Sequence, residues 1–174
     1  MQKEMNEISA LFTKGALAEA LAKCDRLVEA HPKNDAIRYA QGMIRQKSGD
    51  FDGAIESYRA TAKIAPKHTL ALVNLGGLLY GGGRPAEAVD PLQRAIAIDP
   101  QNRPARNNLA HALFAVGEVD AALAEVELAL EHQPDSYELH RLHLQINDQL
   151  DRFDASILCA RRLIGLRLSR FQWL

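Results

Sequence analysis

The sequence has few of the features that mark redox, secreted or membrane-spanning proteins. Only two cysteines are present, Cys24 and Cys159, and no CxxC pair or ligand cluster accompanies them. We expect both to pack as small apolar residues and not to form a disulfide or redox pair. The N-terminal segment MQKEMNEISALFTKG lacks the apolar core of a secretory signal, and no stretch approaches the ~18 uncharged apolar residues of a spanning helix. A cytoplasmic location is therefore expected.

An excess of charge of one sign is also absent. Lys and Arg number 21 against 22 Asp and Glu, so the formal net charge is -1. No overall field attracts phosphate backbones or anionic lipid, and nucleic acid is not an expected partner. Hydrophobic residues make up 47% of the 174 positions, which is enough for one folded domain or a short repeat array.

Motifs of catalytic, metal and cofactor sites are missing as well. The glycines at 81–83 with Arg84 resemble a phosphate-binding loop but lack its Lys-Ser/Thr, so they are expected to form a turn. His140 and His143 are three residues apart without a third metal ligand. No HExxH or GxSxG occurs. Isolated acids are expected on solvated surfaces of second helices: Glu56, Glu87 and Glu125. The sequence thus predicts no enzyme and no cofactor.

What the sequence does contain is a repeat of 34 residues. Proline marks it at Pro32, Pro66, Pro100 and Pro134. Glycine stands seventeen residues before each proline, at Gly15, Gly49, Gly83 and Gly117. Alanine stands twelve residues before each, at Ala20, Ala54, Ala88 and Ala122. Coincidence has a probability on the order of 10⁻⁵ even after the choice of period and phase is allowed for.

Each repeat unit reads as two amphipathic helices, because apolar residues recur at helical spacing, as in Leu72, Leu75 and Leu79. The glycine is expected to end the first helix in a left-handed conformation, and the proline to stop the second. Asp50 and Pro85 suit the start of a second helix. The alanines are expected at the close crossing of the two helices. Aliphatic residues follow them directly: Leu21, Ile55, Val89 and Leu123.

This pattern resembles the tetratricopeptide repeat family over residues 1–136. The third unit carries the family pattern most fully, with Leu72, Leu75, Gly76, Gly83, Ala88, Leu92, Ala95 and Pro100. The fourth carries Leu109, Ala110, Leu113, Gly117, Ala122, Val126, Ala129 and Pro134. The resemblance implies an all-α, right-handed α-solenoid of antiparallel helix hairpins in one domain, 1–174. Pentatricopeptide repeats have a similar length and bind RNA, but the charge balance and the Gly, Ala and Pro phasing favour the protein-binding relatives.

The units are expected at 1–34, 35–68, 69–102 and 103–136, with a degenerate fifth at 137–170. In the fifth, Phe153, Ile157 and Leu163 keep the apolar phase, while Asp151, Ser156 and Leu168 replace Gly, Ala and Pro. The first unit has Glu4 and Glu7 where the third has Leu72 and Leu75, as expected of a face that meets water. Pro91 lies inside a second helix and is expected to remove one backbone hydrogen bond and to kink it.

By the resemblance, the first helices line a concave groove that binds an extended peptide or a helix of another protein. Helical spacing projects toward it Tyr39, Met43, Asn74, Gly77, Tyr80, Asn107, Asn108, His111, Phe114, Arg141 and Gln145. The equivalent Asn74 and Asn108 either bind a ligand backbone or are merely solvated. Tyr80 and Phe114 either anchor a ligand or pack between first helices. Only Lys47 and Arg141 could supply a clamp for a C-terminal carboxylate, which argues against one.

The leading hypothesis is a scaffold or adaptor that binds a partner protein. Two alternatives remain: a module that assembles with itself through its end faces, and a regulatory segment of an enzyme whose catalytic domain is separate.

The C-terminal segment ASILCARRLIGLRLSRFQWL leaves three outcomes open. Four arginines and no acid occur in it, and one helical stripe is apolar: Ile157, Ile164, Leu168 and Phe171. The stripe packs on the preceding helix, or lies on a membrane surface, or belongs to a partly exposed final hairpin. In the last case, exposed apolar residues bury against a second copy or a partner: Leu166, Phe171, Trp173 and Leu174.

Overall fold

The structure is a computed structural model that describes the backbone of residues 1–171 and the side chains of residues 1–167. Over this range the chain forms ten helices and no strand. They are α1 (Gln2–Lys14), α2 (Leu17–Ala30), α3 (Asp35–Ser48), α4 (Phe51–Ile64), α5 (Thr69–Gly81), α6 (Pro85–Ile98), α7 (Arg103–Ala115), α8 (Val119–His132), α9 (Tyr137–Gln149) and α10 (Phe153–Phe171). The predicted all-α class is confirmed.

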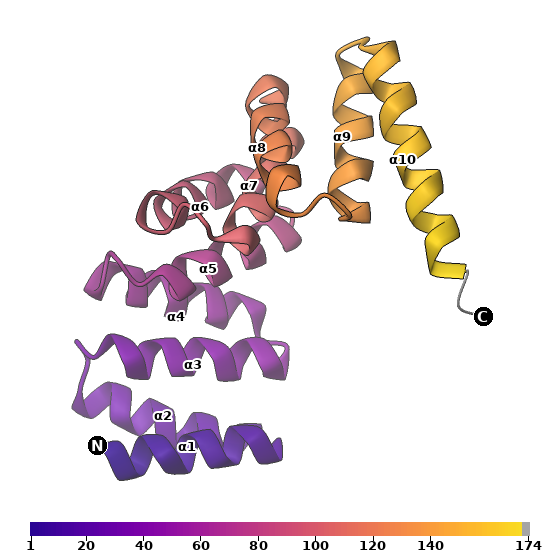
Figure 1. Cartoon of the computed structure of the whole chain (residues 1–174). Coiled ribbons are helices and arrows are strands. Elements are labelled where there is room, and N and C mark those ends of the chain that lie inside the picture. The colour runs from indigo at the N-terminus through magenta and orange to yellow at the C-terminus, as the bar shows by residue number, and fades with distance from the viewer. Residues whose placement is uncertain (172–174) are drawn as a thin grey trace.

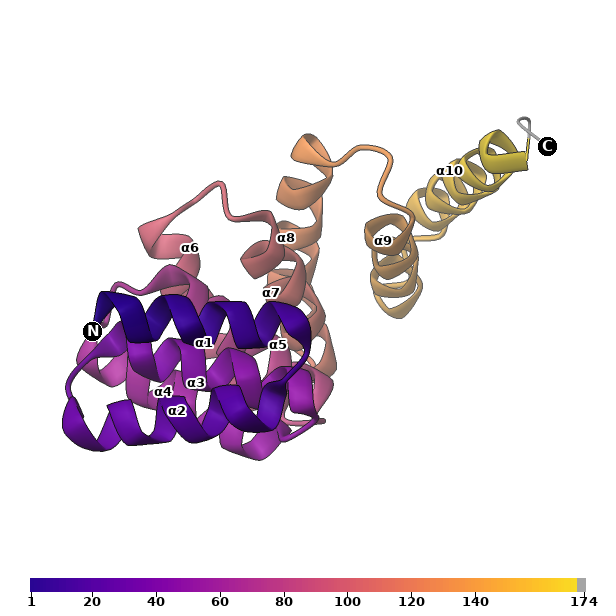
Figure 2. The same ribbon diagram turned by 90° about the horizontal axis from the view of Figure 1, so that it is seen from below.

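Consecutive helices pair into hairpins, and the hairpins stack in chain order. The second helix of each hairpin contacts the first helix of the next, and the first helix α7 also contacts the first helices α5 and α9. The helices α1 to α4 lie nearly level in Figure 1, whereas α8, α9 and α10 stand upright, so the stack turns along its length. Viewed from below, α1 and α2 lie at one end and the α9–α10 hairpin at the other (Figure 2). The predicted solenoid of helical hairpins is confirmed.

The repeated glycines end the first helices as predicted. Gly15, Gly49, Gly83 and Gly117 have φ values of 80°, 87°, 74° and 86°. A side chain would strain this left-handed backbone, whereas glycine adopts it freely. In the fifth hairpin Asp151 takes the same place with φ 55°, the one described non-glycine residue with a positive φ. Aspartate is among the few residues that tolerate this conformation.

The starts of the second helices also follow the prediction where it named residues. The Asp50 side chain accepts a hydrogen bond of 3.0 Å from the Gly53 amide and caps α4. Pro85 is the first residue of α6, where its missing amide hydrogen leaves no bond unmade. Pro91 is buried, and α6 remains one helix on both sides of it.

The small residues lie where helices cross closely. Ala20, Ala54, Ala88 and Ala122 are 0% exposed. A Cβ built on Gly76 of α5 would come within 2.4 Å of the Leu92 side chain in α6, which shows how near the two helices approach. The core between the hairpins is therefore formed by repeated small and aliphatic residues that leave no room for larger side chains.

The first hairpin presents charges at its outer end. Glu4 pairs with the amino terminus at 2.8 Å, and Glu7 pairs with Lys23 of α2 at 2.6 Å. These residues meet water as predicted. One of the acids expected on a solvated surface does not: Glu125 is 21% exposed in its side chain and pairs with Arg106 at 2.6 Å. This ion pair joins α8 to α7, and the Glu125 side chain is partly buried there.

The two cysteines are free and buried, as predicted. Burial raises the pKa of the Cys24 thiol to about 11, so this side chain stays protonated and unreactive at neutral pH. Across the described residues, no helix is long and apolar enough to cross a membrane.

Two of the residues that keep the apolar phase in the fifth unit are exposed in the structure. Phe153 is 68% exposed and Ile157 is 50% exposed, and the residues of α10 that face inward are Ser156 and Cys159. Leu123, which lies 34 positions before Ile157, is part of the core, and another hairpin packs against its helix α8. In the described chain no further hairpin packs against α10. Ile164 is also 60% exposed, so both residues of the stripe whose side chains the structure describes, Ile157 and Ile164, are largely exposed.

The predicted C-terminal patch falls only partly on described residues. Leu166 is half-buried. The side chains of Leu168 and Phe171, together with Trp173 and Leu174, lie outside the described residues.

The close crossing of α5 and α6 predicts that Ala88→Leu lowers the free energy of unfolding by about 1–3 kcal/mol, because the added atoms have no space. Ala86→Leu, at an exposed position of the same helix, is the matched control and should change stability by less than about 0.5 kcal/mol. Urea unfolding followed by circular dichroism measures both values. Equal stabilities of the two variants would show that Ala88 is not at a tight crossing.

Candidate functional site

The first helices share one surface, because side chains at three equivalent positions of each helix fall in line along the stack. We call this the first-helix surface. Its first column is Met5, Tyr39, Val73, Asn107 and Arg141. Its second column is Ser9, Met43, Gly77, His111 and Gln145. Its third column is Phe12, Gln46, Tyr80, Phe114 and Asp148. Except for Val73, these residues are half-buried or exposed, as an accessible surface requires.

The chemistry of the first-helix surface changes along the array. In α1 and α3 the columns hold the apolar side chains of Met5, Phe12 and Met43, beside the ring of Tyr39. In α7 and α9 they hold mainly amides, a histidine and charged groups, as at Asn107 and Arg141, with the ring of Phe114 as the exception. A partner that lies along the whole surface would therefore meet an apolar half and a polar half.

The apolar half is hollowed. One depression of about 510 Å³ is lined by Phe12, Tyr39, Met43, Gln46, Lys47, Phe51, Tyr58 and Asn74. A smaller one of about 150 Å³ is lined by Met5, Ile8, Ser9, Phe12, Ala40, Met43 and Ile44. The two share Phe12 and Met43, so we treat them as one feature, the N-terminal hollow. It extends from α1 across α3 to α5.

A hydrogen-bond network lies at one side of this hollow. The Asn74 amide nitrogen donates to the hydroxyls of Tyr39 and Tyr58 at 3.2 and 3.3 Å. Tyr58 in turn donates to the Gln46 side-chain oxygen at 2.8 Å. Burial raises the pKa of the Tyr58 hydroxyl to about 12, which keeps it protonated and able to donate. The amide hydrogens of Asn74 thus serve contacts within the protein.

Asn108, one unit further on, is placed differently although it is equivalent in sequence. The residues that correspond to Tyr39 and Tyr58 are Val73 and Leu92, which carry no hydroxyl. No hydrogen bond of the Asn108 side chain occurs within the described part of the chain, and its amide nitrogen lies beside Gly77. Asn108 therefore keeps its donors and its acceptor for a ligand or for water.

Tyr80, His111 and Phe114 lie together in the middle of the surface. Tyr80 stacks on His111 with ring centroids 5.7 Å apart, and Tyr80 and Phe114 pack partly against the core. Burial lowers the pKa of His111, and the nearby positive charge of Arg141 lowers it further, so the ring is neutral at pH 7. These rings are partly committed to packing between neighbouring first helices.

Asn107 and Arg141 have partners within the protein. Asn107 exchanges two hydrogen bonds with Gln133, of 3.1 and 3.5 Å, and Arg141 donates to Glu138 at 2.9 Å. The Arg141 pair is exposed and easily exchanged for a ligand contact. Asn107, in contrast, helps to hold the loop after α8.

Sequence reasoning missed several residues of the N-terminal hollow: Met5, Phe12, Gln46, Phe51 and Tyr58. The repeat itself points to some of them, because stepping back by 34 residues leads from Tyr80 to Gln46 and then to Phe12. Phe51 and Tyr58 belong to a second helix, and only the folded structure brings them to this surface.

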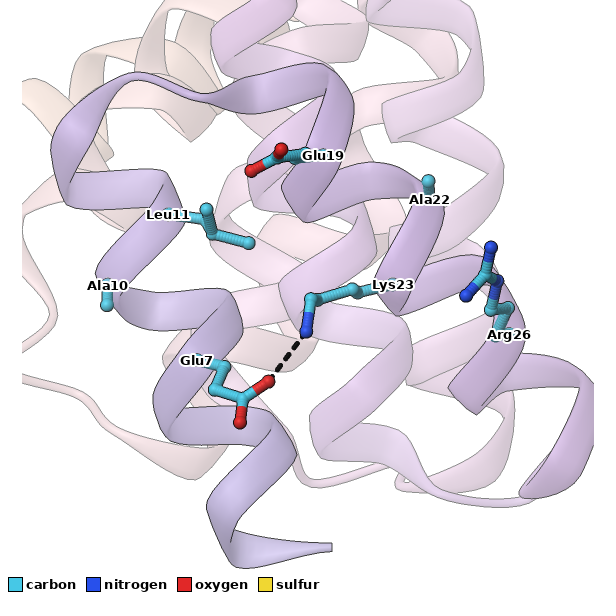
Figure 3. Close-up of a pocket in the computed structure, with 7 residues that line it drawn as sticks. All are labelled: Glu7, Ala10, Leu11, Glu19, Ala22, Lys23 and Arg26. Atoms are coloured by element: carbon cyan, nitrogen blue, oxygen red, sulfur yellow. Dashed lines mark hydrogen bonds and ion pairs between the residues drawn. The ribbon is translucent and has the colours of Figure 1, made fainter.

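A third depression, of about 430 Å³, lies between α1 and α2 (Figure 3). Its lining includes Glu19 and Arg26, and the ion pair between Glu7 and Lys23 crosses it (Figure 3). These charges suit a solvated end of the array better than an apolar ligand.

The histidine pair considered for a metal is not assembled into a site. His140 bonds to the Pro134 carbonyl at 2.8 Å, and His143 lies 4.0 Å from Glu127. No group of three His, Cys, Asp or Glu side chains within residues 1–167 is arranged to hold a metal ion.

The network around Asn74 predicts that Asn74→Ala lowers the free energy of unfolding by about 1–3 kcal/mol, since it leaves the buried Tyr58 hydroxyl without one partner. Asn108→Ala should change it by less than about 0.5 kcal/mol, because no bond within the protein is lost. Thermal and denaturant unfolding compare the two. If both variants are as stable as the unmodified chain, the Asn74 network contributes nothing to the fold.

Comparison with known proteins gives one family. Two sequence profiles of the tetratricopeptide repeat match the chain, over residues 39–103 and 79–146. The small glutamine-rich tetratricopeptide repeat-containing protein 2 of Mycosarcoma maydis is 29% identical over 110 residues, which cover 63% of this chain and 30% of that protein. The chain thus spans less than a third of the length of this relative.

Solved structures share the fold. The MamA RS-1 double mutant superposes with a TM-score of 0.91 at 18% identity and covers 98% of this chain and 96% of its own. YrrB, described as a TPR protein with an unusual peptide-binding site, superposes with a TM-score of 0.88 at 18% identity and covers 94% of this chain and 84% of its own. With the two profiles spanning residues 39–146 between them and this fold across the chain, the protein belongs to the tetratricopeptide repeat family.

Proposed function

We propose that this protein is an adaptor that binds a peptide or helix of a partner protein along the first-helix surface, in the concave groove of the solenoid. The fold is in general a scaffold for protein–protein interaction. The observation that carries the proposal is the N-terminal hollow, which opens across three successive first helices, α1, α3 and α5. One extended segment would contact several repeat units there, as the family's mode of binding requires.

The projected groove residues have different roles in this proposal. Met43, Tyr39 and Phe114 offer apolar and aromatic contacts, and Tyr80 with His111 offers a stacked pair of rings. Asn108 supplies a free amide for the ligand backbone. Asn74 and Asn107 shape the groove through their bonds within the protein, and Arg141 supplies a charge at its polar end.

The similarity to YrrB supports a peptide as the ligand class. We assign the chain itself no reaction and no cofactor, and we place it in the cytoplasm.

Blocking the middle of the groove tests the proposal. Gly77 faces Asn108 across the gap between α5 and α7, so Gly77→Arg inserts a long side chain next to a flexible one. Short random peptides displayed on phage would be selected on the whole chain, and the affinity of the enriched peptides measured by fluorescence anisotropy. We expect Gly77→Arg to weaken them at least about tenfold, which is about 1.4 kcal/mol.

Ala97→Arg, at an exposed position of the second helix α6, is the matched control and should bind like the unmodified chain. A selection that enriches no peptide, or peptides that bind Gly77→Arg unchanged, would contradict binding in the groove.

A second candidate function, self-association, is favoured by the exposed face of α10. Four large apolar side chains lie exposed there: Phe153, Ile157, Leu158 and Ile164. The opposite end of the array carries Glu7, Lys23 and other charges, so end-to-end stacking would bury ions against an apolar face. We therefore propose that the α10 faces of two copies meet across a two-fold axis.

Replacing two of these residues tests the second candidate. Sedimentation equilibrium of the whole chain should show a dimer at high concentration, and the double variant Ile157→Asn with Ile164→Asn should remain a monomer because the apolar contact is lost. Leu70→Asn, at a position 58% exposed on α5, serves as the control and should still dimerise. A wild-type chain that stays monomeric throughout the concentration range rules the dimer out.

A further inference from the structure

We propose that the N-terminal hollow recognises one kind of peptide segment, in which a large apolar residue stands next to an acidic residue. This inference rests on the proposed adaptor function and names the chemistry of the partner. The segment would place its apolar side chain between α1 and α3, and its carboxylate beside Lys47.

The apolar part of the segment follows from the smaller depression. Its volume is about 150 Å³, and its walls are apolar side chains such as Met5, Ile8 and Phe12, with the small Ser9 at one edge. An apolar cavity of this order accepts a benzene-sized group. Met43 forms a wall of both depressions, and a methionine side chain adapts its shape to different apolar ligands. A leucine, methionine or phenylalanine side chain fits this description.

The acidic part of the segment follows from the single charge at the hollow. Among the described residues that line the two depressions, Lys47 is the one with a charge. Its ammonium nitrogen lies 4.2 Å from the centroid of the Phe12 ring and donates to the Phe12 carbonyl at 3.2 Å. These contacts hold the ammonium over the hollow, and an ammonium with three hydrogens retains further donors.

No carboxylate of the described residues pairs with Lys47. Asp50 follows it closely in the chain, but that side chain caps α4 and lies 3.8 Å from Arg45. A cation beside an apolar hollow without an acid of its own favours a ligand with a negative charge. One lysine suits a single carboxylate, whereas phosphorylated segments are usually held by clusters of arginine.

A double-mutant cycle on a selected peptide tests the pairing. Short random peptides would be selected on the whole chain by phage display, and an enriched peptide synthesised in two forms, one with its Asp or Glu and one with Asn or Gln there. On the unmodified chain we expect the amide form to bind about threefold to tenfold more weakly. On Lys47→Gln both forms should bind equally, and on the control Lys67→Gln, an exposed loop lysine, the full difference should return.

The apolar part has its own variant. Ser9→Phe places a ring at the edge of the smaller depression without removing a core residue, because Ser9 is exposed. We expect it to weaken the selected peptides at least about tenfold while circular dichroism shows an unchanged melting curve.

The outcomes separate the two proposals. Two outcomes overturn this inference and leave the adaptor function standing. In the first, the selected peptides are weakened by Gly77→Arg but carry no apolar–acidic pair. In the second, replacing the acid of a peptide lowers its affinity equally for Lys47→Gln and for the unmodified chain. Peptides that bind Gly77→Arg unchanged, or a selection that enriches none, overturn the adaptor function itself.

Discussion

Each hairpin of this protein depends on its neighbour, because its second helix carries an apolar face that the first helix of the next hairpin covers. Ile55 of α4 and Leu123 of α8 are nearly fully buried in this way. A single hairpin would leave such residues in water, at a cost of about 1.5–3 kcal/mol for each large side chain. The stack is therefore a chain of nearest-neighbour contacts in which stability accumulates from one unit to the next.

The same dependence explains why the two ends differ. At the first hairpin, Glu7 stands where the third and fourth units have Leu75 and Leu109, and it forms with Lys23 an ion pair that water can solvate. At the last hairpin, Ile157 still has the residue type of a covered position, and it is 50% exposed. One end of the array is thus adapted to solvent, while the other retains the chemistry of an interface. That asymmetry supports α10, and not α1, as the place where a further helix would add.

Stacking also creates the first-helix surface, since it holds equivalent positions of successive first helices in line. The backbone geometry repeats while the side chains do not. The columns run from Met5 and Phe12 at one end to Arg141 and Gln145 at the other, so the scaffold displays a gradient from apolar to polar chemistry. A partner selected by this surface would be recognised by the order of its residues and not by any one contact. Beside the apolar half, Lys47 is the one charged residue among the described residues that line the N-terminal hollow.

The periodicity of the sequence was sufficient to identify the hairpins, because each marker acts locally. Gly49 ends a helix through its own backbone freedom, Asp50 caps the next through a bond three residues away, and Ala88 fits a crossing within one hairpin. The helix hairpins followed from these local rules, and the all-α solenoid followed from the resemblance of their pattern to the tetratricopeptide repeat family. The projection of Tyr39, Met43, Asn108 and the other groove positions also rests on helical spacing, and their binding role stays a prediction.

Only the tertiary structure distinguished residues that the repeat makes equivalent. Asn74 and Asn108 occupy the same position in adjacent units, yet Asn74 meets two tyrosine hydroxyls where Asn108 meets none. Ile157 and Leu123 are likewise equivalent, and one is exposed where the other is covered. In each pair the difference lies in residues from a neighbouring helix or hairpin, which a 34-residue period does not specify. Local backbone preferences determined where this chain turns, and contacts between units determined what each repeated side chain does.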